Sequence, residues 1–158
     1  MLGQAISRGS GLLLLRQQTA VARRSMSEMA FTFAAPNAVH YNAVNIKQVD
    51  VPSFSGSFGI LPAHVPSLAV LKPGVVTVFE EGGETKKFFV SSGSVTINED
   101  SSVQILAEEA HPLESLDASA AQKALSEAQA ALNSASSDEA KAEAQIAVEV
   151  AEEIIKSV

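Results

Sequence analysis

The sequence predicts a β-sandwich of about eight to ten short strands in two sheets, followed by a C-terminal antiparallel α-helical hairpin. Three observations predict this fold class. Apolar and polar residues alternate with the period of a β-strand from residue 29 to about residue 110. Turn signals interrupt the alternation at intervals of roughly 8–12 residues. Beyond residue 112 the chain becomes rich in alanine at helical spacing. We therefore expect a leader over residues 1–24, a sandwich over 25–111 and a hairpin over 112–158.

The leader has the composition of a mitochondrial transit peptide. All four arginines of the chain lie in the first 24 residues, and the first acidic residue is Glu28. Three of the arginines share one side of a helical wheel and leucines occupy the other, as in basic amphipathic helices that bind anionic membranes. The leucine run over 12–15 is far shorter than the ~18 apolar residues that span a bilayer. We expect cleavage shortly after Arg24; the alternative is a disordered basic tail.

In the strand region, apolar residues occur in pairs that are separated by one intervening residue. The pairs are Phe31 and Phe33, Val44 and Ile46, Val76 and Val78, Phe88 and Val90, Val95 and Ile97, and Val103 and Ile105. After Ile46 the apolar positions change parity to Val49 and Val51, which predicts a β-bulge. Pro73-Gly74 predicts a tight turn with a positive φ at the glycine, and Gly82-Gly83 predicts a hairpin tip.

One stretch interrupts the alternation. Residues 55–68 contain two glycines and two prolines after Ser55, which predicts a shaped loop. The loop also carries Phe58, Ile60 and Leu61, which is more apolar surface than an exposed loop needs. Two interpretations remain open: the loop folds back onto the core, or it faces a partner.

The C-terminal region predicts two short helices. Asp117 is a candidate N-cap, and Ser136 with Glu139 fits a capping box before the second helix. The predicted facing stripes are Ala118, Ala121, Leu125, Ala128 and Leu132 in the first helix, and Ala140, Ala144, Ala147, Ala151, Ile154 and Val158 in the second. Isolated helices of about 15 residues are marginal in water, so the hairpin must gain stability from packing on the sandwich or on a partner.

No pattern of catalytic or ligand-binding residues is present. The chain has no cysteine, its three histidines lack metal-ligand spacing, and neither a phosphate-binding glycine loop nor a nucleophile elbow occurs. From Ser25 onward the chain has seven lysines and 18 acidic residues, which gives a net charge of 7 − 18 = −11. Such an acidic body is a poor partner for nucleic acid. We expect no catalytic residue, no cofactor, no metal site and no nucleic-acid partner.

A longer string resembles a known family. The segment SGSFGILPAHVPSLAVLKPGVVTV, and within it GILPAHVPSL over Gly59–Leu68 followed by KPG over Lys72–Gly74, is similar to the small central-stalk subunits of F-type ATP synthases. These subunits are called delta in mitochondria and epsilon in bacteria and chloroplasts. The similarity continues through KKFFVSSGSVTINEDSSVQILAEEAHPLESLD and covers the chain from about Met29 to its end.

The resemblance implies a structural rotor subunit rather than an enzyme. It implies binding to the gamma subunit, to the small mitochondrial epsilon subunit and to the ring of c subunits, at the matrix side of the mitochondrial inner membrane. Membrane association would then occur only through the complex. The family's rotor-interface loop maps onto Ser57, Phe58, Gly59, Ile60, Leu61, Pro62 and His64.

One position departs from a pattern found in some bacterial relatives, which bind ATP at the helical tail. Their motif places an arginine shortly after a Leu-Asp or Ile-Asp pair, whereas here Ala120 follows Leu116-Asp117 at that place. We therefore expect a docked tail without ATP sensing. The alternative functions are a nucleotide-sensing regulatory subunit and a ligand-binding β-sandwich of the mitochondrial matrix.

Overall fold

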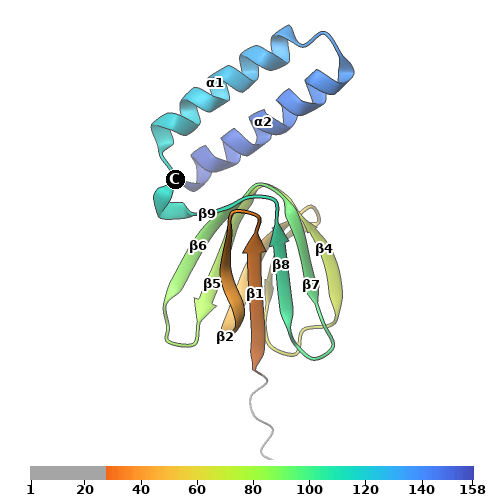
Figure 1. Ribbon diagram of the computed structural model, residues 1–158, viewed down its shortest axis with the longest axis vertical. Helices are drawn as coiled ribbons and strands as arrows, with labels where there is room; N and C mark the ends of the chain where they lie inside the picture. The colour runs from red at the N-terminus through yellow and green to blue at the C-terminus, as the bar shows by residue number, and fades with distance from the viewer. Residues whose placement is uncertain (1–27) are drawn as a thin grey trace, which may run out of the picture.

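The computed structural model describes residues 28–158, so the predicted leader lies outside the described residues. Nine strands form a β-sandwich and two helices form a hairpin beside one end of it (Figure 1). The fold class predicted from the sequence is confirmed. Neither helix in this part of the chain is long and apolar enough to cross a membrane.

The elements follow the chain in a simple order. The strands are β1 (Met29–Ala35), β2 (Ala38–Ser53), β3 (Gly56–Ile60), β4 (Ser67–Leu71), β5 (Gly74–Glu80), β6 (Thr85–Val90), β7 (Gly93–Ile97), β8 (Val103–Ala107) and β9 (Ala110–Pro112). A 3-10 turn, η1 (Leu113–Ser115), leads to α1 (Ala118–Ser134) and α2 (Asp138–Ser157).

The long strand β2 joins the two layers of the sandwich. One layer contains β1, β8, β7 and β4, in which β1 and β8 run parallel and the other neighbours are antiparallel. The other layer contains β5, β6 and β9, with β3 paired to β2. The first half of β2 pairs with β1 and its second half with β5. The register with β5 shifts between Ile46 and Gln48, which confirms the predicted bulge.

The core lies between the layers and contains the inward residues of the alternating pattern. Phe31, Phe33, Val76, Val78 and Ile105 are each completely buried. Burying one such side chain contributes about 1.5–3 kcal/mol relative to leaving it exposed. This apolar filling between paired strands gives the sandwich its stiffness.

Gly83 and Gly74 are glycines for different physical reasons. Gly83, at the predicted tip of the β5–β6 hairpin, has φ 91°. Gly74 is not among the residues with positive φ and begins β5, so the predicted positive-φ turn there is wrong. A Cβ on Gly74 would lie 2.9 Å from the Pro52 side chain, so glycine is needed there for a close approach.

Both helices begin at side-chain caps. Asp117 accepts hydrogen bonds from the backbone N–H groups of Ser119 (2.7 Å) and Ala120 (3.2 Å), which confirms the predicted cap. The second cap is Ser137, which accepts from the Ala140 N–H, and not Ser136 as predicted. Both serines precede α2, and the helix begins one residue later than a cap at Ser136 would predict.

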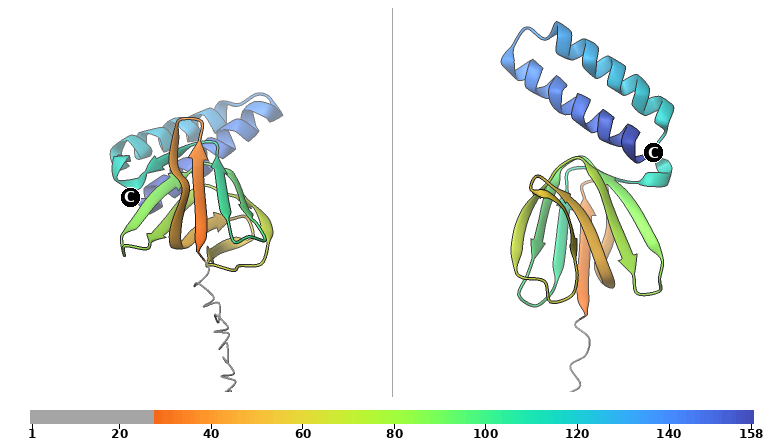
Figure 2. Two further views of the ribbon diagram at one scale, coloured as in Figure 1. Left: turned by 60° about the horizontal axis from the view of Figure 1, so that its bottom comes forward. Right: turned by 180° about the vertical axis from the view of Figure 1, so that it is seen from behind.

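The hairpin contacts the sandwich mainly through α2, which packs near β5, and its helix–helix turn extends away from the strands (Figures 1 and 2). In α1 the inner side contains Ala121, which is buried, and Leu125, which is partly buried, as predicted. In α2 Val148 is buried whereas the predicted Ala147 is exposed, so the inner stripe is rotated by one residue in the middle of the helix.

Candidate functional site

The seven residues of the predicted interface divide between a strand and a loop. Ser57, Phe58, Gly59 and Ile60 lie in β3, and Leu61, Pro62 and His64 lie in the connection to β4. The predicted loop is therefore wrong for residues 56–60, which form β3, and for Ser67 and Leu68, which begin β4. The reason is β2, whose last residues form an edge with which β3 pairs, with Val51 opposite Phe58 and Val49 opposite Ile60.

The residues of β3 point in different directions. Ile60 is completely buried and belongs to the core, and Phe58 is partly buried against that core. Ser57 is exposed. For Ile60, therefore, the interpretation that this segment folds back onto the core agrees with the structure.

A side chain at Gly59 would meet the ends of two side chains on β2. A Cβ at this position would lie 2.7 Å from Asp50 Oδ1 and 3.0 Å from Gln48 Nε2. The Gln48 amide donates a hydrogen bond to the Asp50 carboxylate directly over the glycine. A larger residue at this position would make the Gln48 and Asp50 side chains shift.

The following loop is held in one shape by three contacts. The His64 N–H donates to the Leu61 carbonyl at 3.1 Å, which closes a turn. The His64 ring lies 6.2 Å from the Phe58 ring. Ala63 adopts φ 62°, and its N–H donates to the Ser101 hydroxyl at 3.2 Å, which ties the loop to the β7–β8 turn.

This fixed loop presents apolar side chains to solvent at the end of the sandwich away from the hairpin. Leu61 is 55% exposed and Val65 is 72% exposed, and the β4 residue Leu68 follows at 75%. We call Leu61 and Val65 the end patch. Val65 and Leu68 were not among the seven predicted interface residues, although both lie in the stretch of glycines and prolines over residues 55–68.

A second surface covers the outer side of the layer that contains β4, β7, β8 and β1. The outward residues alternate with the buried ones along each strand. They are Ala30, Thr32 and Ala34 on β1, Gln104 and Leu106 on β8, Ser94 and Thr96 on β7, and Leu68 and Val70 on β4. None of these side chains is charged, and we call this set the uncharged face.

One row of the uncharged face crosses four strands and places Ser94 between two aliphatic residues. Val70 lies opposite Ser94, Ser94 opposite Leu106, and Leu106 opposite Ala34. Val70 and Leu106 are each 59% exposed. In a chain with seven lysines and 18 acidic residues beyond Ser25, a face that has no charge and exposes two neighbouring aliphatic side chains is typical of a protein-binding surface.

The strongest polar cluster is structural. Tyr41 donates to Glu80 at 2.8 Å, and Lys86 lies 2.8 Å from the same carboxylate. These bonds hold the pKa of Glu80 below its ordinary value, and burial with the Glu80 hydrogen bond raises the pKa of Tyr41. The cluster links β2, β5 and β6. Among residues 28–158, no three acidic or histidine side chains converge as metal ligands would.

Fold and surfaces together define a class of protein. A rigid sandwich with exposed apolar surfaces at one end and on one face, and with a lightly attached helical hairpin, is typical of a subunit that binds other chains. A family model described as the β-sandwich domain of the ATP synthase delta/epsilon chain matches residues 28–113. The chain therefore belongs to the ATP synthase delta/epsilon family, as the resemblance in the sequence indicated.

Similar proteins extend this result beyond the sandwich. A Caenorhabditis elegans protein named ATP synthase subunit delta, mitochondrial, is 46% identical over 136 residues, covering 86% of this chain and 83% of the relative. The protein of the same name in Yarrowia lipolytica is 41% identical, covering 87% and 88%. A solved structure of the Euglena gracilis mitochondrial ATP synthase, containing OSCP, F1 and the c-ring, includes a chain that is 25% identical with a TM-score of 0.74, covering 98% and 88%.

Proposed function

We propose that the chain is a non-catalytic subunit of the central stalk of mitochondrial ATP synthase, which couples rotation of the c-ring to the gamma shaft. The observation that carries the proposal is the fixed apolar end patch on a stiff sandwich, in a chain of the delta/epsilon family. This subunit would transmit rotation mechanically and would catalyse no reaction itself. The catalytic residues would lie on other chains of the complex.

The end patch and its loop are the proposed contact with the c-ring. A coupling must keep its shape under load, and the turn at Leu61, the Phe58–His64 ring contact and the bond to Ser101 hold this loop in place. Leu61 and Val65 supply the apolar surface that a specific interface buries at its centre. Pro62 and His64 shape the loop. Ser57 borders it, and Ile60 anchors it in the core.

The uncharged face is the proposed contact with gamma. Its small outward residues on β7 lie between larger ones on β4 and β8, and strands are spaced about 4.8 Å apart. The two rows of larger residues are thus separated by about 10 Å, which is close to the diameter of a helix. An apolar helix of the shaft could therefore lie along β7. The absence of charge on this face favours a neutral partner surface.

The remaining parts of the proposal follow from the same assignment. The subunit would lie peripherally at the matrix side of the mitochondrial inner membrane and would reach the membrane only through its partners. Residues 1–24 would serve as the import leader, 25–111 as the clamp and 112–158 as the hairpin. The hairpin contacts the sandwich over a small area, which leaves apolar helix surface exposed. The small mitochondrial epsilon subunit is the proposed further partner that covers this surface.

Purification from solubilised inner membrane tests the assignment to the stalk. A tagged copy of this chain should bring down catalytic and c-ring subunits in fixed stoichiometry. A chain that purifies without both of them contradicts the proposed function.

A substitution tests the end patch. Leu61→Asp places a charge in the proposed c-ring contact, so the stalk should retain far less c-ring, while the β-rich circular dichroism of the isolated chain stays the same. Ile146→Asp is the matched control, because Ile146 is exposed to a similar degree (60%) on the hairpin. Full retention of the c-ring by the Leu61 variant would show that this loop is not the contact.

A further inference from the structure

The turn between β7 and β8 lies directly beside the end patch. The Ala63 N–H, in the end-patch loop, donates to the Ser101 hydroxyl of this turn at 3.2 Å. Both residues have positive φ, 62° at Ala63 and 69° at Ser101. Such conformations are unfavourable for a residue with a Cβ and persist where the surrounding contacts hold them. Loop and turn therefore form one fixed unit.

The turn brings two acidic side chains to this unit. The backbone N–H and the hydroxyl of Ser102 both donate to Asp100 Oδ1, at 2.9 Å and 2.6 Å, and these bonds lower the pKa of Asp100. Asp100 is thus ionised at neutral pH. Its neighbour Glu99 is exposed. In the described part of the chain, neither carboxylate forms an ion pair.

Further acidic residues surround the same end of the sandwich. The β5–β6 connection lies at this end, away from the hairpin (Figures 1 and 2), and its residues Glu81 and Glu84 are exposed. The lysines nearest to it are Lys86, which is bound to Glu80 at 2.8 Å, and the exposed Lys47. The aliphatic end patch therefore has an acidic rim.

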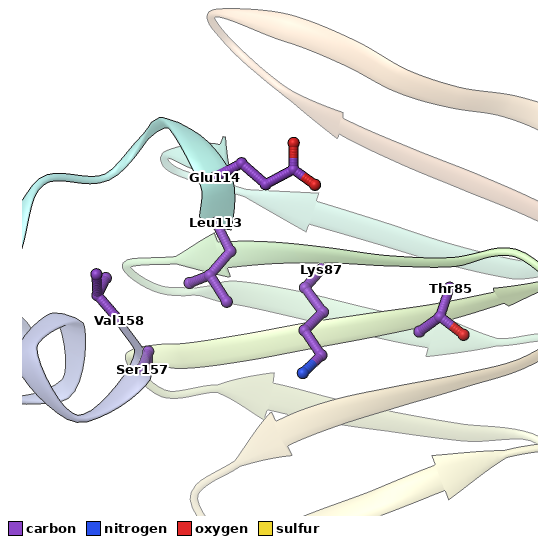
Figure 3. Close-up of a pocket in the computed structure, with 6 residues that line it drawn as sticks. All are labelled: Thr85, Lys87, Leu113, Glu114, Ser157 and Val158. Carbon is purple, nitrogen blue, oxygen red and sulfur yellow. The ribbon is translucent and has the colours of Figure 1, made fainter.

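The other end of the sandwich offers a contrast. A cavity of about 340 Å³ lies there, between β6, η1 and the end of α2, and is lined by Thr85, Lys87, Leu113, Glu114, Ser157 and Val158 (Figure 3). Its lining includes an ammonium group and a carboxylate, so charges of both signs are supplied within the chain. The acidic rim of the end patch has no such balance, which indicates a partner of opposite charge.

The charge of the rim also decides which kind of partner fits. Complementary interfaces place positive groups opposite negative ones. Membrane surfaces made of anionic lipids would repel an acidic rim. In contrast, membrane-embedded proteins carry an excess of Lys and Arg in loops on the cytoplasmic side, to which the mitochondrial matrix side corresponds. Loops of a membrane-embedded ring therefore match this end better than lipid does.

We propose that the end patch binds loops of the c-ring that carry Lys or Arg, and that Glu99 is the residue that recognises this positive charge. The proposal rests on the proposed function and adds the chemistry of the partner surface to it. Leu61 and Val65 would form the centre of the contact, and Glu99 would lie at its rim. Rim charges contribute mainly to orientation and specificity.

The salt dependence of the contact tests the proposal. The assembled synthase, solubilised and held through the tagged chain, is washed with rising concentrations of potassium chloride. Screening shortens the reach of exposed charges from about 10 Å at 0.1 M to about 3 Å at 1 M salt. The c-ring retained should therefore fall with salt, and Glu99→Gln should make this fall smaller. Retention that does not depend on salt would overturn the proposal.

Charge reversal tests the single residue. Glu99→Lys should lower retention of the c-ring about fivefold, the upper range for one exposed ion pair. Retention of gamma and the β-rich circular dichroism should stay the same. Glu109→Lys is the matched control, because it makes the same change at an exposed residue of the β8–β9 turn, at the other end of the sandwich.

Two outcomes would contradict the assignment of Glu99. Undiminished retention of the c-ring by Glu99→Lys would show that this residue does not recognise it. An equal loss with Glu109→Lys would show that only the overall charge of the chain matters. In both cases the catalytic and c-ring subunits still purify with the unmodified chain, so the proposed function stands. Loss of both from the unmodified chain contradicts the function itself.

Lipid vesicles test the alternative partner. The isolated chain should bind vesicles of phosphatidylcholine with phosphatidylserine no better than vesicles of phosphatidylcholine alone. Preferential binding to the anionic vesicles, abolished by Leu61→Asp, would assign the end patch to the membrane surface and overturn the proposed recognition of the c-ring.

Discussion

The sandwich and the hairpin are stabilised in different ways. The sandwich has one continuous core that includes Phe31, Phe33 and Ile105, all completely buried. In the hairpin four residues are buried, three of them alanines: Ala121, Ala144, Val148 and Ala151. Alanine has little apolar surface to bury, so the second region gains much less from removal of water.

This difference indicates how the two regions share the function. The sandwich holds its surfaces in place by its own packing, as a coupling between moving parts requires. The hairpin contacts the sandwich through a small area of α2, and helices of this length are marginal alone. We therefore expect the sandwich to be the more stable region and the hairpin the less stable one.

The largest expected effect tests the core. Phe33 is completely buried and its ring lies 5.3 Å from that of Phe88, so Phe33→Ala removes a packed ring from the centre of the sandwich. Such substitutions cost about 3–5 kcal/mol of unfolding free energy. Urea denaturation followed by β-sheet circular dichroism measures this loss. Val148→Ala in the hairpin should cost far less in the same transition, and equal losses would contradict the division into two regions.

A smaller effect tests the independence of the hairpin. Asp117→Ala removes the cap of α1 and should cost about 1 kcal/mol of local helix stability. Amide exchange in α1 should accelerate accordingly, while exchange in β5 and β8 stays unchanged. Asp117→Asn is the matched control, because asparagine is also a good N-cap. A parallel acceleration in the sandwich strands would show that the two regions open together.

The same contrast explains what the sequence could predict. Alternation between β-branched or aromatic residues and polar ones defines which side of a strand is buried, so the strands, the core and the bulge after Ile46 could be predicted. In α2 alanines occupy several sides of the helix, and the pattern could not distinguish a stripe through Ala147 from one through Val148. Because the sides of α2 differ little in apolar character, packing decides which side is buried.

The candidate surfaces depend on pairing, which a sequence pattern does not contain. Strand β3 was missed because Gly56 and Gly59 are poor strand formers, and its partner is the far end of β2. The position of Ile60 in the core follows from that pairing. That β9 pairs only with the second half of β6 was also not predictable, because it depends on where β9 stops. The exposed Leu61 lies in a stretch that its glycines and prolines identified.

The smallest expected effect concerns a histidine in the sandwich, close to the start of β9. The His40 ring lies 5.0 Å from the Phe33 ring and 4.7 Å from the Phe88 ring, and its Nε2 is buried without a hydrogen-bond partner. This burial lowers the pKa of His40 from its ordinary value of 6.5, and the charge of His111 acts in the same direction. A hydrogen bond with the Ala110 carbonyl opposes the shift.

The sign of the pH dependence follows from this lowered pKa. The unfolded chain binds a proton at His40 near pH 6.5, whereas the folded chain does so only at lower pH. Stability should therefore fall as the pH drops below about 6.5. His40→Phe keeps an aromatic ring between Phe33 and Phe88 but cannot titrate, so its urea midpoint should change less between pH 7.5 and pH 5.5. His64→Phe controls for the loss of a histidine elsewhere. An equal loss in the unmodified chain and the His40 variant would mean that other groups cause the acid sensitivity of the sandwich.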